Sequence, residues 1–239
     1  MKKEQRRGFT LIELLVVISI IALLMSMLMP ALKRVRDQAK AVVCMAQLKQ
    51  WATIFEMYTN ENNGKFQESL NVGEDTYGEY YQDAKLKLCP KANKTYEEGA
   101  RDPFAANTRT ADPTSYGINS WIISYTSGNR IDEYLWKTPN VKRANEVPVY
   151  GDMQVYSNTT PFPYDEPPAY PGEPLSGNDD ELRSVCGNRH NGGVQWLFAD
   201  WSVRKVGLKE LWDLRWHRNW IEESEDAGEP DWPEWMDNL

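Results

Sequence analysis

The sequence contains few histidines and cysteines, the residues that many metal centres and nucleophilic sites require. Among its 239 residues there are two histidines and three cysteines, whereas a zinc centre needs roughly three or four ligands. It has no phosphate-cradling glycine loop and no arrangement of serine, histidine and aspartate for nucleophilic catalysis. No repeat with a period of roughly 20–50 residues is present. We therefore expect a protein that is not an enzyme and that carries no cofactor and no metal.

Positive charge is also scarce. The chain has 27 Lys and Arg residues against 35 Asp and Glu residues, which gives a formal net charge of −8. Because nucleic-acid binding depends on an excess of positive charge near the phosphates, this acidity argues against nucleic acid as a partner. Three cysteines weakly favour an oxidising compartment, with one disulfide and one remaining thiol. The length fits one domain of roughly 200 residues.

The first long segment is apolar and has one charge. From Phe9 to Met29 there are 21 residues, of which only Glu13 is charged. A helix of this length measures about 31 Å, enough to cross the hydrocarbon core of a bilayer. The alternative, a removed secretory signal peptide, has an apolar core of about 7–15 residues before a small-residue cleavage site. Here the run is longer and Pro30 follows it, so we expect a single membrane-spanning segment over residues 9–29.

Basic residues on both sides of this run affect its expected orientation. Residues 1–8 carry a net charge of +3, from Lys2, Lys3, Arg6 and Arg7 against Glu4. Positive charge stays on the cytoplasmic side of a membrane, which predicts a cytoplasmic N-terminus. Further positive charges follow the run and weaken this prediction, namely Lys33, Arg34 and Arg36.

The junction between the basic residues and the apolar run has the sequence Gly8-Phe9-Thr10-Leu11-Ile12-Glu13. It resembles the processing site of type IV pilins and type II secretion pseudopilins. In that family prepilin peptidase cleaves after the glycine and methylates the new N-terminal residue, and the fifth mature residue is glutamate. The resemblance implies cleavage between Gly8 and Phe9, N-methylation of Phe9 and an assembly role for Glu13. It also implies a helix break at Pro30, where these pilins commonly carry a helix-weakening proline.

The charge of Glu13 has a physical use in this interpretation. A carboxylate deep in lipid costs roughly 2.5 kcal/mol or more, and a buried unpaired charge several kcal/mol. If subunits stack with an axial offset, the Phe9 amine of one subunit can neutralise Glu13 of its neighbour. A tolerated glutamate near the helix end is the alternative. Removal of residues 1–8 would change the side-chain charge from −8 to −11.

After Pro30 the helical pattern continues and becomes amphipathic over residues 30–59. One face carries apolar residues at spacings of 4, 3, 4 and 3, namely Cys44, Leu48, Trp51, Phe55 and Tyr58. The stretch Asn60–Gly64 should end the helix, with Gly64 as a left-handed cap. A calcium site there is the alternative, but the spacing of its acidic groups does not fit an EF-hand loop. We expect the apolar face to pack onto a globular head.

Residues 60–207 are expected to form a β-rich head. Short strands or strand ends are predicted within Leu86–Ala92, Thr114–Tyr125 and Val147–Asp152. Residues 159–181 contain six prolines and predict an irregular surface loop. The expected fold class is α+β and pilin-like, with one long N-terminal helix packed on a small antiparallel sheet with irregular loops.

A second motif lies near residues 186–207. Val194–Ala199 and Ser202–Val206 predict a hairpin. The stretch resembles a C-terminal signature that accompanies the pilin-type leader in many bacterial proteins, a histidine followed by nine residues and then Asp-Gly. His190 and Asp200 match it, but Trp201 replaces the glycine. Because a type I′ turn needs positive φ at both central residues, which Trp disfavours, we expect a different or longer turn.

The role of His190 has three interpretations. A structural histidine that bonds backbone or carboxylate groups is favoured. With Cys186 and Asp200 it has the residue types of a thiol protease, and with Cys186 and either Asp200 or Asp152 those of a metal site.

The C-terminal residues 208–239 are rich in tryptophan. Trp212, Trp216 and Trp220 are four residues apart and predict a helix over about residues 208–221, followed by a tail. Packing against the head is favoured for these side chains. Subunit contacts in a filament and a surface that binds sugar or cargo remain alternatives, since Trp is common at interfaces.

The three cysteines allow three pairings. Cys44 lies on the apolar helix face, and Cys89 precedes Pro90 and is therefore biased toward an extended conformation. An extended segment crossing the helix face would bring the two together, so Cys44–Cys89 is favoured over Cys89–Cys186, Cys44–Cys186 and no disulfide. Closing a loop of about 45 residues adds roughly 4 kcal/mol on the chain-entropy model.

Two classes of function are compatible with these features. The first is a structural pseudopilin-like subunit in a filament of type II secretion or type IV pili. Its partners would be prepilin peptidase, other pilin or pseudopilin subunits and the inner membrane, with the head in the periplasm or in an exported filament. The second is a membrane-tethered domain that binds carbohydrate or cargo, or less favourably an enzymatic one, and that uses the leader for export. The leader favours the first.

Overall fold

The computed structural model describes residues 11–68, 74–81, 83–92, 114–124, 132–154, 158–171, 173, 181–237 and 239. Its contacts divide the chain into two compact units, residues 1–39 and residues 40–239, and we call the second unit the head. The helices are α1 (Leu11–Glu61), α2 (Glu74–Tyr77) and α3 (Trp220–Ala227). The strands are β1 (Tyr116–Asn119), β2 (Pro148–Asp152), β3 (Asn158–Thr159), β4 (Gly193–Phe198) and β5 (Val203–Gly207). Several 3₁₀ turns connect them.

The first part of α1 is long and apolar enough to cross a membrane by its length and composition. Its large apolar side chains from Leu11 to Leu32 are exposed. The predicted break at Pro30 is wrong, because α1 continues through this residue. A proline inside a helix removes one backbone hydrogen bond, and its ring crowds the carbonyl four residues earlier. Both effects are local, and α1 continues on either side of Pro30.

The last part of α1 supplies one wall of the head core. The apolar face predicted from the sequence is buried, with Cys44, Leu48, Trp51 and Phe55 all 0% exposed. After Glu61, Asn63 (φ 58°) and Gly64 (φ 73°) take left-handed conformations. The N–H of Gly64 donates to the carbonyl of Thr59 at 2.8 Å, which closes the helix end as such caps do.

The sheet has five strands in the order β3-β1-β2-β4-β5. Neighbouring strands are antiparallel except β1 and β3, which are parallel. The predicted all-antiparallel sheet is therefore corrected to a mixed one. The strand predicted within Leu86–Ala92 is absent, because this stretch begins in a 3₁₀ turn (Ala84–Lys87) and continues irregularly. The short strand β3 gave no sequence signal.

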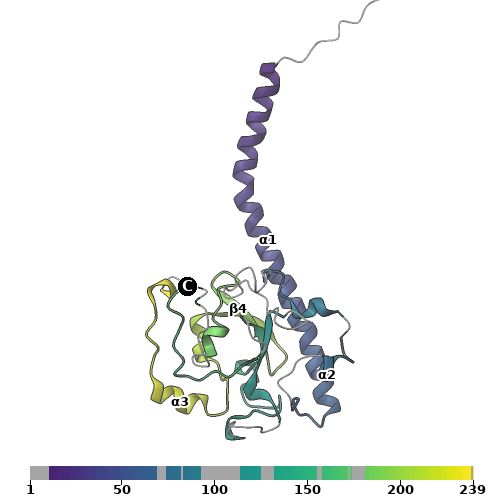
Figure 1. Cartoon of the computed structure of the whole chain (residues 1–239), viewed down its shortest axis with the longest axis vertical. Helices are drawn as coiled ribbons and strands as arrows, with labels where there is room; N and C mark the ends of the chain where they lie inside the picture. Colours follow the sequence, from purple (N-terminus) through teal and green to yellow (C-terminus); the bar gives the residue numbers. More distant parts are fainter. Residues whose placement is uncertain are drawn as a thin grey trace, which may run out of the picture. The chain divides into compact units, whose positions relative to one another are not determined.

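Both faces of the central strands are covered, which leaves every residue of β1, β2 and β4 buried. On one face Trp51 of α1 lies 5.0 Å from Tyr150 of β2, measured between ring centroids. On the other face Trp196 of β4 contacts Trp216 of the C-terminal segment, with centroids 4.9 Å apart. Figure 1 shows β4 in the middle of the head, between the end of α1 on one side and α3 on the other. The head is thus a three-layer arrangement.

The helix predicted over residues 208–221 is wrong. The chain there forms a 3₁₀ turn (Lys209–Asp213), then becomes extended at Leu214, and α3 begins only at Trp220. Tertiary hydrogen bonds replace the helical ones, since Asn119 Nδ2 and Trp136 Nε1 both donate to the carbonyl of Trp216, at 2.8 and 3.0 Å. The tryptophans nevertheless pack as favoured, because Trp212, Trp216 and Trp220 are all buried.

The proline-rich segment is packed against the head more closely than a surface loop would be. Within its described residues, the prolines at positions 161, 163, 167 and 168 are buried. Its carbonyls accept hydrogen bonds from three indoles, those of Trp121, Trp212 and Trp235. Because proline has no backbone N–H, this segment has more backbone acceptors than donors. The N–H groups of the three indoles supply donors for some of these carbonyls.

The β4–β5 turn is longer than a two-residue type I′ turn, which agrees with the different or longer turn predicted from the sequence. Trp201 donates its N–H to the carbonyl of Phe198 at 2.9 Å, and Phe198 donates to Ser202 at 2.9 Å. Only Trp201 has positive φ, at 65°. This is a three-residue loop with a type I turn followed by one left-handed residue. Position 201, where the related signature has glycine, is therefore the one residue of this loop with a left-handed backbone conformation.

This conformation makes a prediction for Trp201. Trp201→Gly should be more stable than Trp201→Ala by about 1 kcal/mol, because both lose the indole but only alanine keeps a Cβ in the left-handed region. Thermal unfolding followed by tryptophan fluorescence measures the difference. At Lys205, on the exposed edge of β5, the same two substitutions should rank in the opposite order. Equal stabilities of the two Trp201 variants would contradict the turn assignment.

Candidate functional site

The N-terminal segment contains the residues that the sequence singled out for processing. Gly8 and Phe9 lie outside the described residues, so their processing roles stay predictions. Glu13 lies in the first turn of α1, where the helix dipole favours a negative charge. It is surrounded along the helix by exposed apolar side chains such as Ile12 and Leu14. Glu13 is therefore a carboxylate in the first turn of a helix whose first part is otherwise apolar.

A second group of interacting residues lies inside the head. Cys44 of α1 and Cys89 form a disulfide with Cα atoms 5.2 Å apart, the pairing favoured from the sequence. His190 Nε2 lies 3.4 Å from the sulfur of Cys89 and 3.0 Å from Asp152 Oδ2. Arg189 donates from Nη1 to Asp152 Oδ1 at 2.7 Å. We call these five residues the buried cluster; each is at most 4% exposed.

The charge of Asp152 is held in place by its neighbours. The Gln195 N–H also donates to Oδ2 at 2.8 Å. Burial alone would raise the pKa of Asp152, but the charge of Arg189 and the contact with His190 outweigh it and lower the pKa below its usual value. His190 Nδ1 has no hydrogen-bond partner among the described residues. The imidazole is therefore oriented through Nε2, as expected for a structural histidine bonded to a carboxylate.

The two residues of the C-terminal signature are not brought together. His190 precedes β4 and is buried, whereas Asp200 follows β4 and is exposed at the turn. Asp200 Oδ1 accepts from the N–H and hydroxyl of Ser202, at 2.9 and 2.6 Å, and so shapes the loop. Cys186 is a buried free thiol whose pKa is raised by burial. A reactive thiol would need the opposite shift.

The N-terminal segment has counterparts in known proteins. Residues 4–29 match the prokaryotic N-terminal methylation motif. The chain is 37% identical over 62 residues to type II secretion system core protein G of Pseudomonas aeruginosa, which covers 26% of this chain and 44% of that protein. It is 47% identical over 57 residues to the type IV wide pilus major component PilA4 of Thermus thermophilus, which covers 24% of this chain and 44% of that protein.

These matches confirm the resemblance to pilins and pseudopilins seen in the sequence. The chain spans less than half of each relative, 44% in both cases. No solved structure matches the chain. The methylation motif includes the beginning of α1 and ends at residue 29, before Pro30. It therefore combines the basic leader, Glu13 and the apolar helix in one unit.

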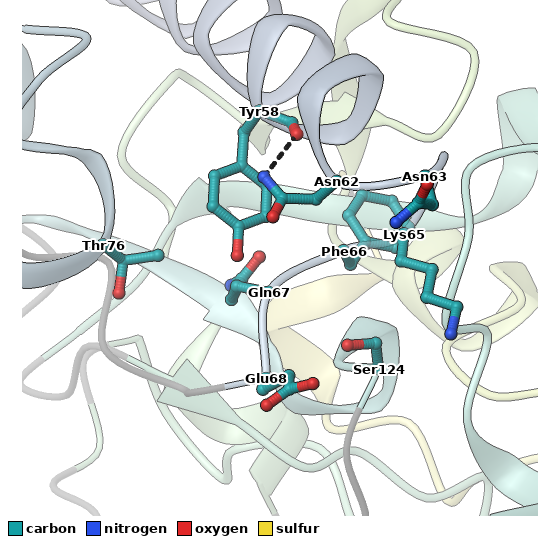
Figure 2. A pocket seen from close by; sticks show the side chains of 9 residues that line it. All are labelled: Tyr58, Asn62, Asn63, Lys65, Phe66, Gln67, Glu68, Thr76 and Ser124. Atoms are coloured by element: carbon teal, nitrogen blue, oxygen red, sulfur yellow. Dashed lines mark hydrogen bonds between the residues drawn. The ribbon is translucent and has the colours of Figure 1, made fainter.

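The head also has a polar pocket of about 550 Å³, which lies next to the C-terminal end of α1. Figure 2 shows Asn62 folded back on the helix, where its Nδ2 donates to the carbonyl of Tyr58 at 2.8 Å. Gln67 is fully buried, and its Oε1 accepts from the hydroxyl of Tyr77 at 2.5 Å. The pocket is lined by Tyr58, Asn62, Asn63, Lys65, Phe66, Gln67, Glu68, Thr76 and Ser124.

The residues that sequence reasoning missed belong to the buried cluster. The sequence suggests Asp152 only as a possible metal ligand beside Cys186, and it indicates no role for Arg189. Arg189 is 37 residues from Asp152 and His190 is 101 residues from Cys89 along the chain. The one local signal was a charged pair, Arg189-His190, within an otherwise glycine-rich approach to a hairpin.

Proposed function

We propose that this protein is a structural, pilin-like subunit that assembles into a filament of type II secretion or type IV pili. The observation that carries the proposal is the match of residues 4–29 to the N-terminal methylation motif, continuous with a helix apolar and long enough to span a membrane. The two relatives support the same interpretation, since one is a secretion system core protein and the other a pilus component. Neither relative is named as an enzyme, and we assign no catalysis to this chain.

The proposed route begins at the inner membrane. Prepilin peptidase cleaves between Gly8 and Phe9 and methylates the Phe9 amine. The apolar part of α1 holds the subunit in the membrane, with the head in the periplasm as the basic leader indicates. On assembly the Phe9 amine of one subunit lies beside Glu13 of its neighbour. This pairing removes the cost of a carboxylate in apolar surroundings, which is several kcal/mol.

The alternative of a sugar- or cargo-binding domain has less support in the head. Such sites present exposed aromatic faces. All ten tryptophans lie within the described residues, and none is exposed. Seven are buried; Trp201, Trp232 and Trp235 are partly buried and pack against the core. The tryptophans therefore serve packing, and the exposed aromatic side chains of the described residues are two tyrosines, Tyr164 and Tyr170. We do not propose this second function.

Processing and assembly can be tested separately. In cells that contain the peptidase, intact-mass analysis of membrane-extracted protein should show a chain that begins at a methylated Phe9. Gly8→Val should leave the leader attached, because its β-branched side chain would crowd a peptidase subsite that takes glycine. A wild-type chain that still begins at Met1 would contradict the proposal.

Glu13→Ala should still be cleaved and inserted but should fail to enter filaments. The measurement is the fraction of subunit in sheared or cross-linked filaments, with the membrane-bound fraction as reference. Glu56→Ala is the matched control, since Glu56 is an exposed glutamate on the same helix. If Glu13→Ala assembles as well as Glu56→Ala, the carboxylate is not the docking partner of the amine.

A further inference from the structure

The buried cluster places metal-binding atoms together. The sulfurs of Cys44 and Cys89 and a ring nitrogen of His190 all lie within 4.8 Å of one another, and all three residues are buried. Asp152 lies outside this group of three, but its Oδ2 is 3.0 Å from His190 Nε2, the nitrogen that lies 3.4 Å from the sulfur of Cys89. Two sulfurs and one imidazole nitrogen, with the Asp152 carboxylate as the fourth ligand, form a set that zinc accepts in tetrahedral sites.

We propose that the dithiol form of this protein, in which it is made before the disulfide closes, binds one Zn²⁺ through Cys44, Cys89, His190 and Asp152. Each of the two cysteine thiols loses one proton when the metal binds, and the imidazole proton of His190 moves from Nε2 to Nδ1 so that Nε2 can bind the metal. Two protons are therefore released in total and no electrons are transferred. The disulfide and the zinc site are mutually exclusive, because the same two sulfur atoms serve in each.

The charges of the cluster balance in both states. With the disulfide closed, the negative Asp152 is matched by the positive Arg189, whose Nη1 lies 2.7 Å from Oδ1. With zinc bound, two thiolates and one carboxylate face one dication and one guanidinium, which again sums to zero. An uncompensated charge in such a buried place would cost several kcal/mol. The cluster therefore accommodates either state without a new buried charge.

The four ligands come from separate segments of the head. Cys44 belongs to α1, Asp152 ends β2, Cys89 follows the 3₁₀ turn Ala84–Lys87, and His190 precedes β4. Supporting contacts already fix the carboxylate, since Arg189 and the Gln195 N–H both donate to it. Partners of this kind outside the ligand set orient metal ligands in known sites. Until the disulfide forms, a bound zinc ion would link α1 to the sheet.

Metal binding by the full-length protein in detergent tests the proposal. A phosphine reductant converts the disulfide to two thiols and is itself oxidised to the phosphine oxide with water as the oxygen source. After reduction in mild denaturant, refolding without oxygen and gel filtration with Zn²⁺, we expect one zinc per chain. X-ray absorption should show two sulfurs at about 2.3 Å and nitrogen or oxygen at about 2.0 Å. The oxidised protein should bind none at this site.

Single substitutions test which residues bind the zinc ion. His190→Gln, which can still contact Asp152, should weaken zinc binding by about 100-fold or more. Cys186→Ser is the matched control and should keep the full stoichiometry. The proposal is overturned by a dithiol form without zinc, by a zinc shell without sulfur, or by equal binding in the oxidised protein. Unchanged binding by His190→Gln or loss of binding by Cys186→Ser overturns it too. The absorption measurement on the wild-type chain decides the matter even if His190→Gln does not fold.

Discussion

Arg189→Met should lower the free energy of unfolding of the head by about 3–5 kcal/mol, because it leaves the carboxylate of Asp152 buried without its positive partner. Asp152 is 1% and Arg189 2% exposed. The guanidinium also donates to the carbonyls of Ser115 and Met153, at 2.8 and 2.9 Å, and these acceptors would lose a partner. Tryptophan fluorescence in a urea titration reports this unfolding, since every tryptophan lies in the head.

Two comparisons separate the buried charge from the loss of a long side chain. Arg143→Met breaks an exposed pair with Glu146 and should cost about 0–1 kcal/mol. The double variant Asp152→Asn with Arg189→Met should be more stable than Arg189→Met alone, because a neutral amide can still accept from the Gln195 N–H. If the double variant is no better than the single one, the cost comes from packing and not from the charge.

The stability of the head should also fall as the pH drops from about 6.5 to about 4, by up to about 3 kcal/mol from His217 alone. His217 is 0% exposed, and burial lowers its pKa from 6.5 to about 4. The folded protein therefore holds this imidazole neutral, while the unfolded chain takes up a proton below pH 6.5. The contribution is complete above pH 6.5 and is lost progressively down to about pH 4.

The surroundings of His217 explain this shift. Four aromatic rings lie around the imidazole, with centroids 4.6–5.6 Å away, from Trp121, Tyr134, Phe162 and Trp220. The nearby carboxylate of Glu223 has Oε2 3.5 Å from Nε2, too long for a hydrogen bond, while Oε1 accepts from the hydroxyl of Tyr134 at 2.5 Å.

A ring that does not titrate provides the comparison for His217. In His217→Phe the same pH interval should show a shallower loss of stability, since the protonation of His217 no longer contributes to it. The quantity to compare is the free energy of unfolding of both proteins at several pH values between 4 and 7. A wild-type protein that becomes more stable than His217→Phe on acidification would show that Glu223 holds the imidazole charged.

The sequence by itself determined the features whose signals are local. The apolar run and the stripe from Cys44 to Phe55 depend on spacing along a helix, and α1 presents both as expected. The β4–β5 hairpin is set by two short strands and a turn. The absence of glycine at position 201 correctly predicted a turn other than a two-residue type I′ turn, although Trp201 itself takes a positive φ of 65°. These signals survive because each involves residues within a few turns or one hairpin of each other.

Only the tertiary structure decided the C-terminal segment, the sheet pairing and the buried cluster. Trp212, Trp216 and Trp220 have helical spacing, but the carbonyl of Trp216 accepts from Asn119 and Trp136, which lie far away in sequence. Such bonds outweigh a weak helical preference, because each satisfies a buried polar group that would otherwise cost about 1–3 kcal/mol. Likewise Asp152 and Arg189 meet because two strands pair, and no local pattern encodes which strands those are.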